Sequence, residues 1–183
     1  MTRSLAALGV VAIVLGMAVQ LSTASSGADG KIASVYDGDT VTMANGQRVR
    51  LVQIDTPELG SGECYSRAAR STLVSLAPPG SRVDLEADAR LDQRDRFGRL
   101  LRYVWRYGKN INIELVGRGA ATPYFYEGDR GKYADTLMAA ANLAKANERG
   151  LWKACPGTKL DPYGPVTTIR SGPPAKQRPP SGK

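Results

Sequence analysis

Alternation of apolar and charged positions predicts two strands in the middle of the chain. In segment 82–91, valine, leucine and alanine take every second position and charged residues take the others, which is typical of a half-buried strand. Segment 99–107 repeats leucine, tyrosine and tryptophan with the same period. The seven residues between them end at Gly98, so the two segments predict a β-hairpin.

Three shorter strand candidates precede this hairpin, at residues 32–36, 40–43 and 47–54. Asn45 and Gly46 stand between the second and third of them, and this dipeptide is a strong signal for a tight hairpin turn. The first part of the chain is therefore expected to fold as three consecutive β-strands.

Helical spacing of apolar residues replaces the strand pattern in three other segments, 63–76, 110–116 and 131–149. The first is followed by two prolines and a glycine, and the last by Gly150, which are stop signals for a helix. The order is three strands, a helix, two strands and two helices. It predicts an α+β, mainly β domain, built as a small five-stranded barrel with three packed helices.

The two ends of the chain differ from this domain. With 183 residues and 42% hydrophobic residues, one domain, assigned to residues 30–155, has enough apolar material for a core. Residues 1–28 combine Arg3 with an apolar run and a small-residue exit. They predict a signal peptide for secretion, with an uncleaved membrane anchor holding the protein outside the cytoplasm as the alternative. Residues 156–183 are rich in proline and glycine and predict a disordered basic tail.

The chain contains two cysteines, Cys64 and Cys155. An even number of cysteines after an export signal favours a disulfide over two free buried thiols. Closing so long a loop would contribute on the order of 4 kcal/mol to stability.

Charge and composition narrow the chemistry. The formal net charge of +8 suits a polyanionic partner such as nucleic acid, although charge alone assigns no function. The chain has no histidine, which excludes enzymes that need an imidazole base and sites that bind zinc through histidine. Any catalysis must therefore use carboxylates, arginine, tyrosine, lysine or a hard metal ion.

Oxygen ligands gather in two motifs, DGDT at residues 37–40 and DTPE at residues 55–58. Each follows a predicted strand, so their carboxylates can meet at one side of a barrel. Such ligands suit Ca²⁺ or Mg²⁺, but aspartate and glycine are also ordinary turn residues. Arg50 lies five residues before Asp55, on the opposite face of a straight strand. Bringing these two side chains together requires a bend or a bulge.

Taken in order, these motifs resemble the staphylococcal nuclease (thermonuclease) family. The matching elements run through residues 31–152 as DGDT, RVRLVQIDTPE, DRFGR before an aromatic strand, NINIELVGRGAA, YFY and NERGLW. Six elements in the family's order are far more specific than one tetrapeptide. The resemblance implies a five-stranded OB-fold barrel with three helices. It also implies a monomeric, Ca²⁺-dependent endonuclease that hydrolyses phosphodiester bonds of DNA and RNA, favouring single strands, at the 5′ oxygen to leave 3′-phosphate ends.

The resemblance also implies a metal site. The side chains of Asp39 and Asp55, with the backbone carbonyl of Thr56, would bind Ca²⁺. Asp37 would lie behind these ligands and support the loop that carries Asp39.

The remaining roles follow from the same resemblance. Glu58 would orient or deprotonate the attacking water, while Arg50 and Arg99 would bind the phosphate and stabilise the transition state. Tyr124 and Tyr126 would line the nucleotide pocket. A different class of function, a non-catalytic OB-fold module that binds nucleic acid, remains the alternative. A structural domain of the cell envelope would explain neither acidic motif.

Overall fold

The computed structural model describes residues 28–168. The predicted targeting segment lies outside the described residues, apart from Ala28, and so do residues 169–183 of the predicted tail. None of the helices within residues 28–168 has the length and apolar character needed to cross a bilayer.

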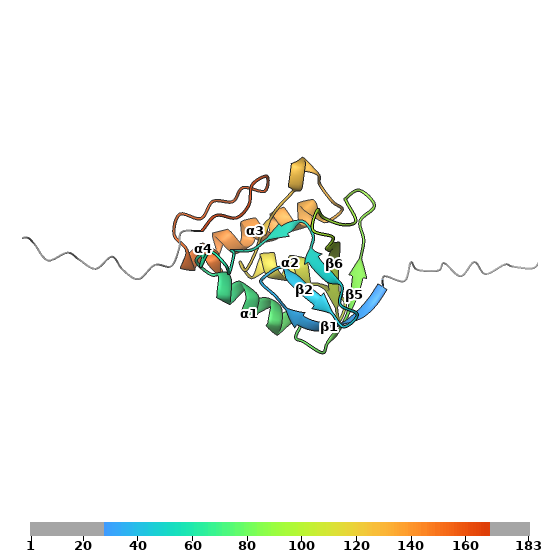
Figure 1. Ribbon diagram of the computed structural model, residues 1–183. Coiled ribbons are helices and arrows are strands. Elements are labelled where there is room, and N and C mark those ends of the chain that lie inside the picture. Colours follow the sequence, from blue (N-terminus) through green and yellow to red (C-terminus); the bar gives the residue numbers. More distant parts are fainter. Residues whose placement is uncertain (1–27, 169–183) are drawn as a thin grey trace, which may run out of the picture.

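Five strands close into a barrel, which confirms the predicted fold class (Figure 1). The strands are β1 (Ala28–Val35), β2 (Thr40–Met43), β3 (Arg48–Leu51), β5 (Arg82–Glu86) and β6 (Leu100–Arg106). Antiparallel pairings run in the order β3, β2, β1, β5, β6, and a parallel pairing of β3 with β6 closes the circle.

Strand β1 belongs to both halves of the barrel. Its first part, from Ala28 to Lys31, pairs with β5, and its second part, from Ile32 to Val35, pairs with β2. The register shifts between Ile32 and Ser34. Such an irregularity bends a strand and lets it turn the corner of a barrel.

Two predicted strands end earlier than the alternation indicates. Segment 47–54 divides into β3 and the short β4 (Ile54–Asp55), which pairs with β8 (Thr122–Pro123). The strand predicted over 82–91 stops at Glu86. Beyond it Asp88 is buried and accepts hydrogen bonds from the backbone N–H groups of Arg90 and Lys132. These bonds bend the chain although its apolar alternation continues.

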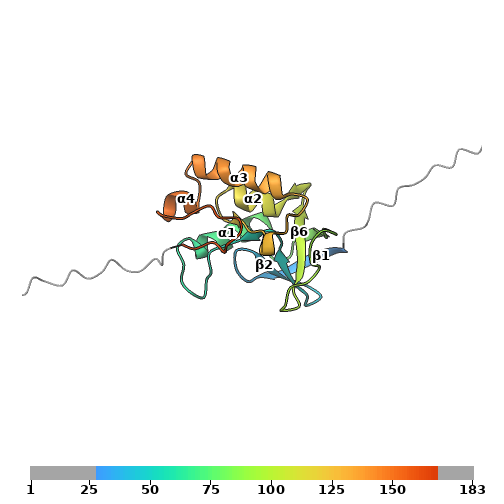
Figure 2. The ribbon, with the colours of Figure 1, turned by 90° about the horizontal axis from the view of Figure 1, so that it is seen from above.

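The three predicted helices are α1 (Ser66–Leu76), α2 (Ile111–Gly117) and α3 (Ala134–Ala146). Figure 2 shows α2 and α3 stacked on one side of the strands. Four short elements were not predicted: β7 (Lys109–Asn110), β8, the 3₁₀ turn η1 (Tyr126–Gly128) and α4 (Leu151–Ala154). Elements of two to four residues are too short to show a period in the sequence.

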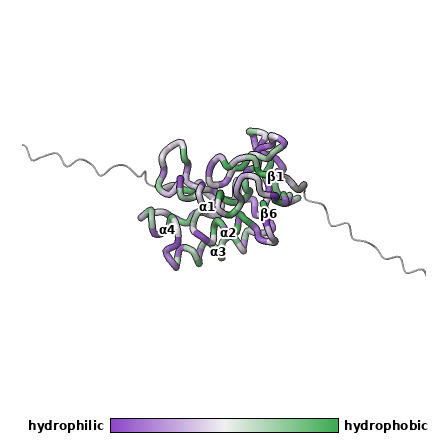
Figure 3. The backbone as a smooth tube through the Cα atoms, turned by 90° about the horizontal axis from the view of Figure 1, so that it is seen from below, coloured by the Kyte–Doolittle hydropathy of each residue, from purple (hydrophilic) through white to green (hydrophobic). Residues whose placement is uncertain are grey.

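The core lies between the barrel and the helices. Apolar segments run through the centre of the molecule in Figure 3, and hydrophilic segments lie mostly at its periphery. Helix α2 buries Ile111, Leu115 and Val116 in this core. Its fully buried Asn112 accepts a hydrogen bond from the backbone N–H of Val104 and donates to the carbonyl of Val52. Asn112 thus ties the helix to the barrel wall.

The C-terminal part of the described chain differs from the predicted unstructured tail. Residues 156–168 lie against the domain, and both Val166 and Thr168 are buried. The backbone N–H of Phe125 donates to the carbonyl of Pro162 at 2.7 Å. The segment contains no helix or strand. Its backbone groups bond to other parts of the domain, so no sequence period predicts its position. It begins after Cys155, which forms a disulfide with Cys64.

Candidate active site

The DGDT motif is a tight turn between β1 and β2. The backbone N–H of Tyr36 donates to the carbonyl of Thr40, and a side-chain oxygen of Asp37 accepts from the backbone N–H of Asp39. A Cβ atom on Gly38 would lie 2.7 Å from the hydroxyl oxygen of Thr56. Glycine is therefore required because the turn packs directly against the DTPE motif.

Asp39 connects the two acidic motifs. Its Oδ2 accepts hydrogen bonds from the backbone N–H and the hydroxyl of Thr56, each at 3.2 Å. Its Oδ1 accepts from the hydroxyl of Thr40 at 3.0 Å. The side chain is buried. The two motifs, far apart in the sequence, are thus joined through one carboxylate.

Arg50 lies between the two carboxylates that the sequence predicts as metal ligands. Its guanidinium is 2.5 Å from Asp39 and 2.8 Å from Asp55. Gln53 has a φ of 64°, a left-handed conformation that is uncommon outside glycine. This residue bends the chain between β3 and β4, which provides the bend that the sequence requires to bring Arg50 and Asp55 together.

Hydrogen bonds to both the side chain and the backbone of Gln53 hold it in this conformation. Its side chain accepts a hydrogen bond from the backbone N–H of Gly131 at 2.7 Å and donates to the carbonyl of Asp129 at 2.8 Å. Its own carbonyl accepts from the backbone N–H of Tyr124. Gln53 is not among the site residues predicted from the sequence. The one hint in the sequence is a polar glutamine between the apolar residues Val52 and Ile54 of a predicted strand.

The carboxyl groups of the site perturb one another. Burial and then the charge of Asp39 raise the pKa values of Asp37 and Asp55. Burial acts to lower the pKa of Arg50, but the charges of Asp39 and Asp55 outweigh it and raise this pKa. Arg50 therefore stays protonated. The three carboxyl groups of Asp37, Asp39 and Asp55 carry more negative charge than its single positive charge can balance.

Glu58 follows the DTPE proline and is exposed at the edge of the same pocket. Its backbone N–H donates to the carboxylate of Glu63 at 3.1 Å. Partial burial, followed by the charges of Asp39, Asp37 and Asp55, raises the pKa of Glu58. A carboxylate with a raised pKa accepts a proton more readily than an ordinary surface glutamate.

Arg99 reaches the pocket from the start of the DRFGR hairpin strand. Its Nε donates to Asp95 at 2.6 Å, and the carboxylate of Asp95 also accepts from the backbone N–H groups of Phe97 and Arg99. Partial burial acts to raise the pKa of Asp95, but the hydrogen bonds from Arg99 and the backbone lower it. Asp95 is not among the predicted site residues, although its position four residues before Arg99 suits such an ion pair.

The pocket has a volume of about 490 Å³ and combines the acidic turn, the arginines and the predicted tyrosines. Tyr124 and Tyr126 line it, with ring centroids 6.3 Å apart in an edge-on arrangement. Phe97 of the DRFGR loop also lines the pocket and packs against Arg96 and Arg99. The exposed aromatic rings and guanidinium groups can contact bases and phosphates.

Asp39, Asp55 and Thr56 offer the oxygen donors that a hard cation prefers. Within residues 28–168, no three histidine, cysteine, aspartate or glutamate side chains form a group that could hold a metal by themselves. The excess of carboxylate charge, in a chain without histidine, nevertheless fits Ca²⁺ or Mg²⁺ with part of the coordination shell from backbone, water or substrate.

Comparison with known proteins finds the family that the sequence motifs resemble. Residues 48–154 match the family described as "Staphylococcal nuclease homologue". The thermonuclease of Staphylococcus intermedius is 31% identical over 129 residues, which cover 67% of this chain and 74% of that protein. The matched region includes both predicted arginines and the DTPE motif.

Two relatives from Bacillus subtilis are larger. Endonuclease YncB is 35% identical over 124 residues, covering 63% of this chain and 57% of the relative. Endonuclease YhcR is 27% identical over 139 residues, covering 68% of this chain but 11% of the relative. The shared region is therefore the domain that carries the pocket, and these relatives contain further sequence.

Proposed function

The chain belongs to the family of staphylococcal nuclease homologues, and on this premise we propose that it is a Ca²⁺-dependent nuclease. It hydrolyses phosphodiester bonds of DNA and RNA, favours single strands and leaves 3′-phosphate ends. The observation that carries the proposal is Arg50 held between Asp39 and Asp55, in a pocket that Glu58 and Arg99 also line.

The metal site consists of Asp39, Asp55 and the backbone carbonyl of Thr56. Each carboxylate oxygen has two lone pairs. The oxygens of Asp55 have one donor each and so keep acceptor capacity for a cation. The oxygens of Asp39 have two donors each, so a cation bound there would replace a donor from Arg50, Thr40 or Thr56. Water and a substrate phosphate would complete the shell of a Ca²⁺ ion, which takes six to eight oxygen ligands. When bound, the cation neutralises phosphate charge and so lets a nucleophile approach phosphorus.

Glu58 acts on the attacking water. It accepts the proton of the water as the water oxygen forms a bond to phosphorus, and the bond from phosphorus to the 5′ oxygen breaks. The 5′ oxygen leaves with the electron pair and takes a proton from solvent. The raised pKa of Glu58 suits a group that must hold this proton.

Arg50 and Arg99 bind the phosphate oxygens on which charge builds. Planar guanidinium groups make paired hydrogen bonds to phosphate, and donors aimed at developing charge lower the barrier. Asp95 fixes the Nε side of Arg99, and Nη1 donates a long hydrogen bond of 3.5 Å to the hydroxyl of Thr40, so Nη2 remains available to substrate. Tyr124 and Tyr126 hold the neighbouring nucleotide by stacking.

The same proposal extends to where the protein acts. Residues 1–28 carry the features of a signal peptide or an uncleaved anchor. The disulfide between Cys64 and Cys155 suits an oxidising compartment. The protein would act as a monomer on nucleic acid outside the cytoplasm.

A cleavage assay with defined metals tests the proposal. Purified protein should degrade single-stranded DNA and RNA with Ca²⁺, lose this activity in EDTA, and yield fragments with 3′-phosphate ends by end-group analysis. Cleavage that persists in EDTA would contradict the metal site. Products with 5′-phosphate ends would contradict the proposed leaving group.

A further inference from the structure

The segment that follows α4 returns to the active site. From Cys155 it runs away from α4 as a loop and then doubles back toward α4 (Figure 1). At its far end, the backbone N–H of Val166 donates to Oδ2 of Asp55 at 2.9 Å, and the bond is buried. These two residues are separated by 111 positions in the sequence.

This bond completes the fixation of the Asp55 carboxylate. Oδ1 accepts from Arg50 at 2.8 Å, and Oδ2 accepts from Val166. With one donor on each oxygen, the plane of the carboxylate cannot rotate without breaking a hydrogen bond. Both oxygens keep a second lone pair, so the carboxylate can still bind a cation.

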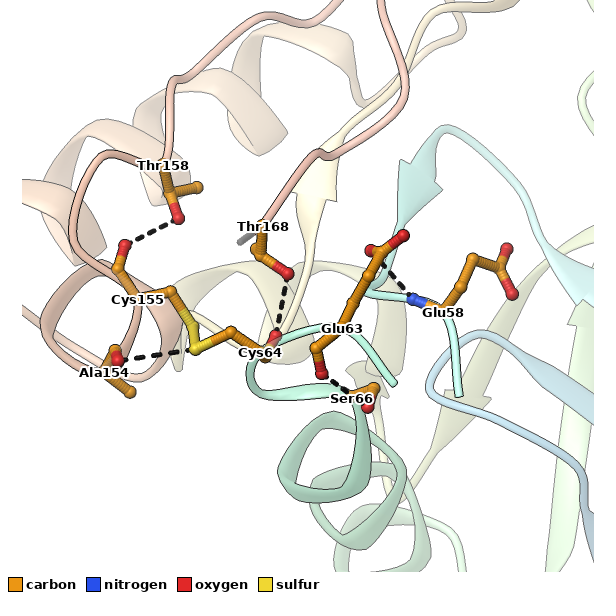
Figure 4. Close-up of a disulfide and its surroundings, with 8 residues drawn as sticks. All are labelled: Glu58, Glu63, Cys64, Ser66, Ala154, Cys155, Thr158 and Thr168. Carbon is orange, nitrogen blue, oxygen red and sulfur yellow. Dashed lines mark hydrogen bonds between the residues drawn. A yellow bond between two sulfur atoms is a disulfide. The ribbon is translucent and has the colours of Figure 1, made fainter. Parts of the chain in front are cut away.

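The segment is fastened to the domain at both ends and between them. It starts at the disulfide of Cys155 with Cys64, and Pro162 accepts from the backbone N–H of Phe125. The hydroxyl of Thr168 donates to the carbonyl of Cys64 at 3.0 Å (Figure 4). Both ends of the segment therefore meet at the same cystine.

The cystine also adjoins the loop that carries Glu58. Figure 4 shows Glu63 between Glu58 and Cys64. The carboxylate of Glu63 accepts from the backbone N–H of Glu58, and the backbone N–H of Glu63 donates to the carbonyl of Glu58. The Cys64–Cys155 cystine thus lies next to both the loop that carries Glu58 and the segment that bonds to Asp55.

We propose that residues 156–168 form a positioning strap, in which the Val166 amide orients Asp55 and the Cys64–Cys155 disulfide secures the strap. Val166 acts through Asp55 and does not touch the reacting atoms, so it is a positioning residue. The inference rests on the proposed function, because it assigns the strap to the metal site of that nuclease.

Two neighbouring proline substitutions test the strap. Val166→Pro removes the donated N–H and keeps an apolar side chain. Thr167→Pro makes the same backbone change at an exposed residue whose N–H has no partner within residues 28–168. Losing an outer hydrogen bond to a metal ligand typically weakens metal binding by about 10- to 100-fold. We expect this loss in Val166→Pro and near-normal binding in Thr167→Pro.

The measurements are Ca²⁺ affinity by calorimetry on the full chain, together with kcat and KM for single-stranded DNA. Val166→Pro should lower Ca²⁺ affinity and kcat at fixed Ca²⁺, with little change in KM. Equal Ca²⁺ affinity in wild type and Val166→Pro would overturn the strap. An equal loss in both proline variants would also overturn it, because the effect would not depend on the Asp55 bond.

A second pair of variants covers the case in which Val166→Pro does not fold. Thr168→Val removes the hydroxyl that bonds to Cys64, and Thr168→Ser keeps it. Thr168→Val should weaken Ca²⁺ binding several-fold, and Thr168→Ser should restore it. Identical Ca²⁺ affinities in these two variants would overturn the anchoring of the strap at the cystine.

These outcomes separate the strap from the proposed function. If the wild type binds Ca²⁺ but does not cleave nucleic acid, the nuclease proposal fails and the calorimetric comparison still decides the strap. If the wild type cleaves and the proline variants do not differ, only the strap fails. If the wild type neither cleaves nor binds Ca²⁺, both are wrong.

Discussion

Arg50 and Asp55 illustrate what single residues reveal in the sequence and what they do not. Their spacing of five places them on opposite faces of a straight strand, so the sequence requires a bend without locating it. The structure puts the bend at Gln53, with a φ of 64°. No turn residue marks this position, because the bend is stabilised by Asp129 and Gly131 from a distant loop.

Residues that act through their side chains can be predicted from sequence motifs, whereas residues that act through their backbone cannot. Asp39, Arg50 and Asp55 were predicted from motifs, and the structure brings them together. Val166 acts through its backbone N–H, and every residue except proline carries that group. A side-chain pattern therefore cannot identify Val166.

Arg99 gives a direct prediction at this scale. Arg99→Ala should lower kcat by about 10²- to 10³-fold, because it removes a charged donor from the developing phosphate charge. Arg99→Lys should recover only part of the rate, since an ammonium group cannot bond to Asp95 and phosphate with the same planar geometry. Steady-state cleavage of single-stranded DNA measures both.

Arg90 provides the matched control for Arg99. Its side chain is 64% exposed and lies 3.8 Å from Asp88, and it does not line the pocket. Arg90→Ala should cleave at close to the wild-type rate. A wild-type rate in Arg99→Ala would contradict the assigned role.

At the scale of elements, the long and regular segments were predictable. The three helices and the NG hairpin between β2 and β3 follow from local periods and turn chemistry. The end of β5 does not, because the apolar alternation continues through Leu91. The strand stops where Asp88 bonds to Lys132, which is a tertiary contact that local periodicity does not contain.

Glu86 at the end of β5 links three elements and leads to a pH prediction. It accepts hydrogen bonds from Trp105, Tyr133 and Lys132. Partial burial acts to raise the pKa of Glu86, but the bonds from Lys132, Trp105 and Tyr133 outweigh it and lower this pKa. Glu86→Gln should reduce the free energy of unfolding at pH 7 by about 1 kcal/mol.

The effect of Glu86→Gln should depend on pH in one direction. A carboxylate with a lowered folded pKa stabilises the fold above its unfolded pKa, and this stability is lost as pH falls through the folded pKa. The difference between wild type and Glu86→Gln should therefore shrink below about pH 4.5. Urea unfolding at several pH values measures it.

Asp135 is the control for the pH series. Its side chain pairs with Arg130 but is fully exposed, so Asp135→Asn should leave the unfolding free energy nearly unchanged. A difference for Glu86→Gln that stays constant from pH 7 to pH 3 would contradict the ionised role of Glu86.

At the scale of the whole molecule, the closed barrel was predictable from the order of its elements, and the path of the C-terminal segment was not. Residues 156–168 contain no apolar period, so the sequence indicated a tail without packed structure. The segment packs because backbone groups of Pro162 and Val166 bond to the domain. A pattern of side chains does not predict such backbone hydrogen bonds.

The disulfide gives a prediction at the same scale. Cys64 and Cys155 are 91 residues apart, and closing a loop of this length stabilises the fold by about 4 kcal/mol in the chain-entropy model. The double variant Cys64→Ser with Cys155→Ser should lose up to this amount in urea unfolding. Wild type measured with a reductant should approach the double variant, and an unchanged midpoint in both would contradict the contribution.

We expect this barrel to cleave nucleic acid at the pocket lined by Asp39, Arg50, Glu58 and Arg99, where Arg50 also pairs with Asp55. The most direct test compares wild type with Glu58→Gln in two measurements, binding of a single-stranded oligonucleotide and its cleavage with Ca²⁺. We predict that both proteins bind alike and that Glu58→Gln cleaves at least about 10²-fold more slowly, because it lacks the proton acceptor. Binding without cleavage by the wild type would instead indicate a nucleic-acid binding module, and equal cleavage by both proteins would contradict the assigned site.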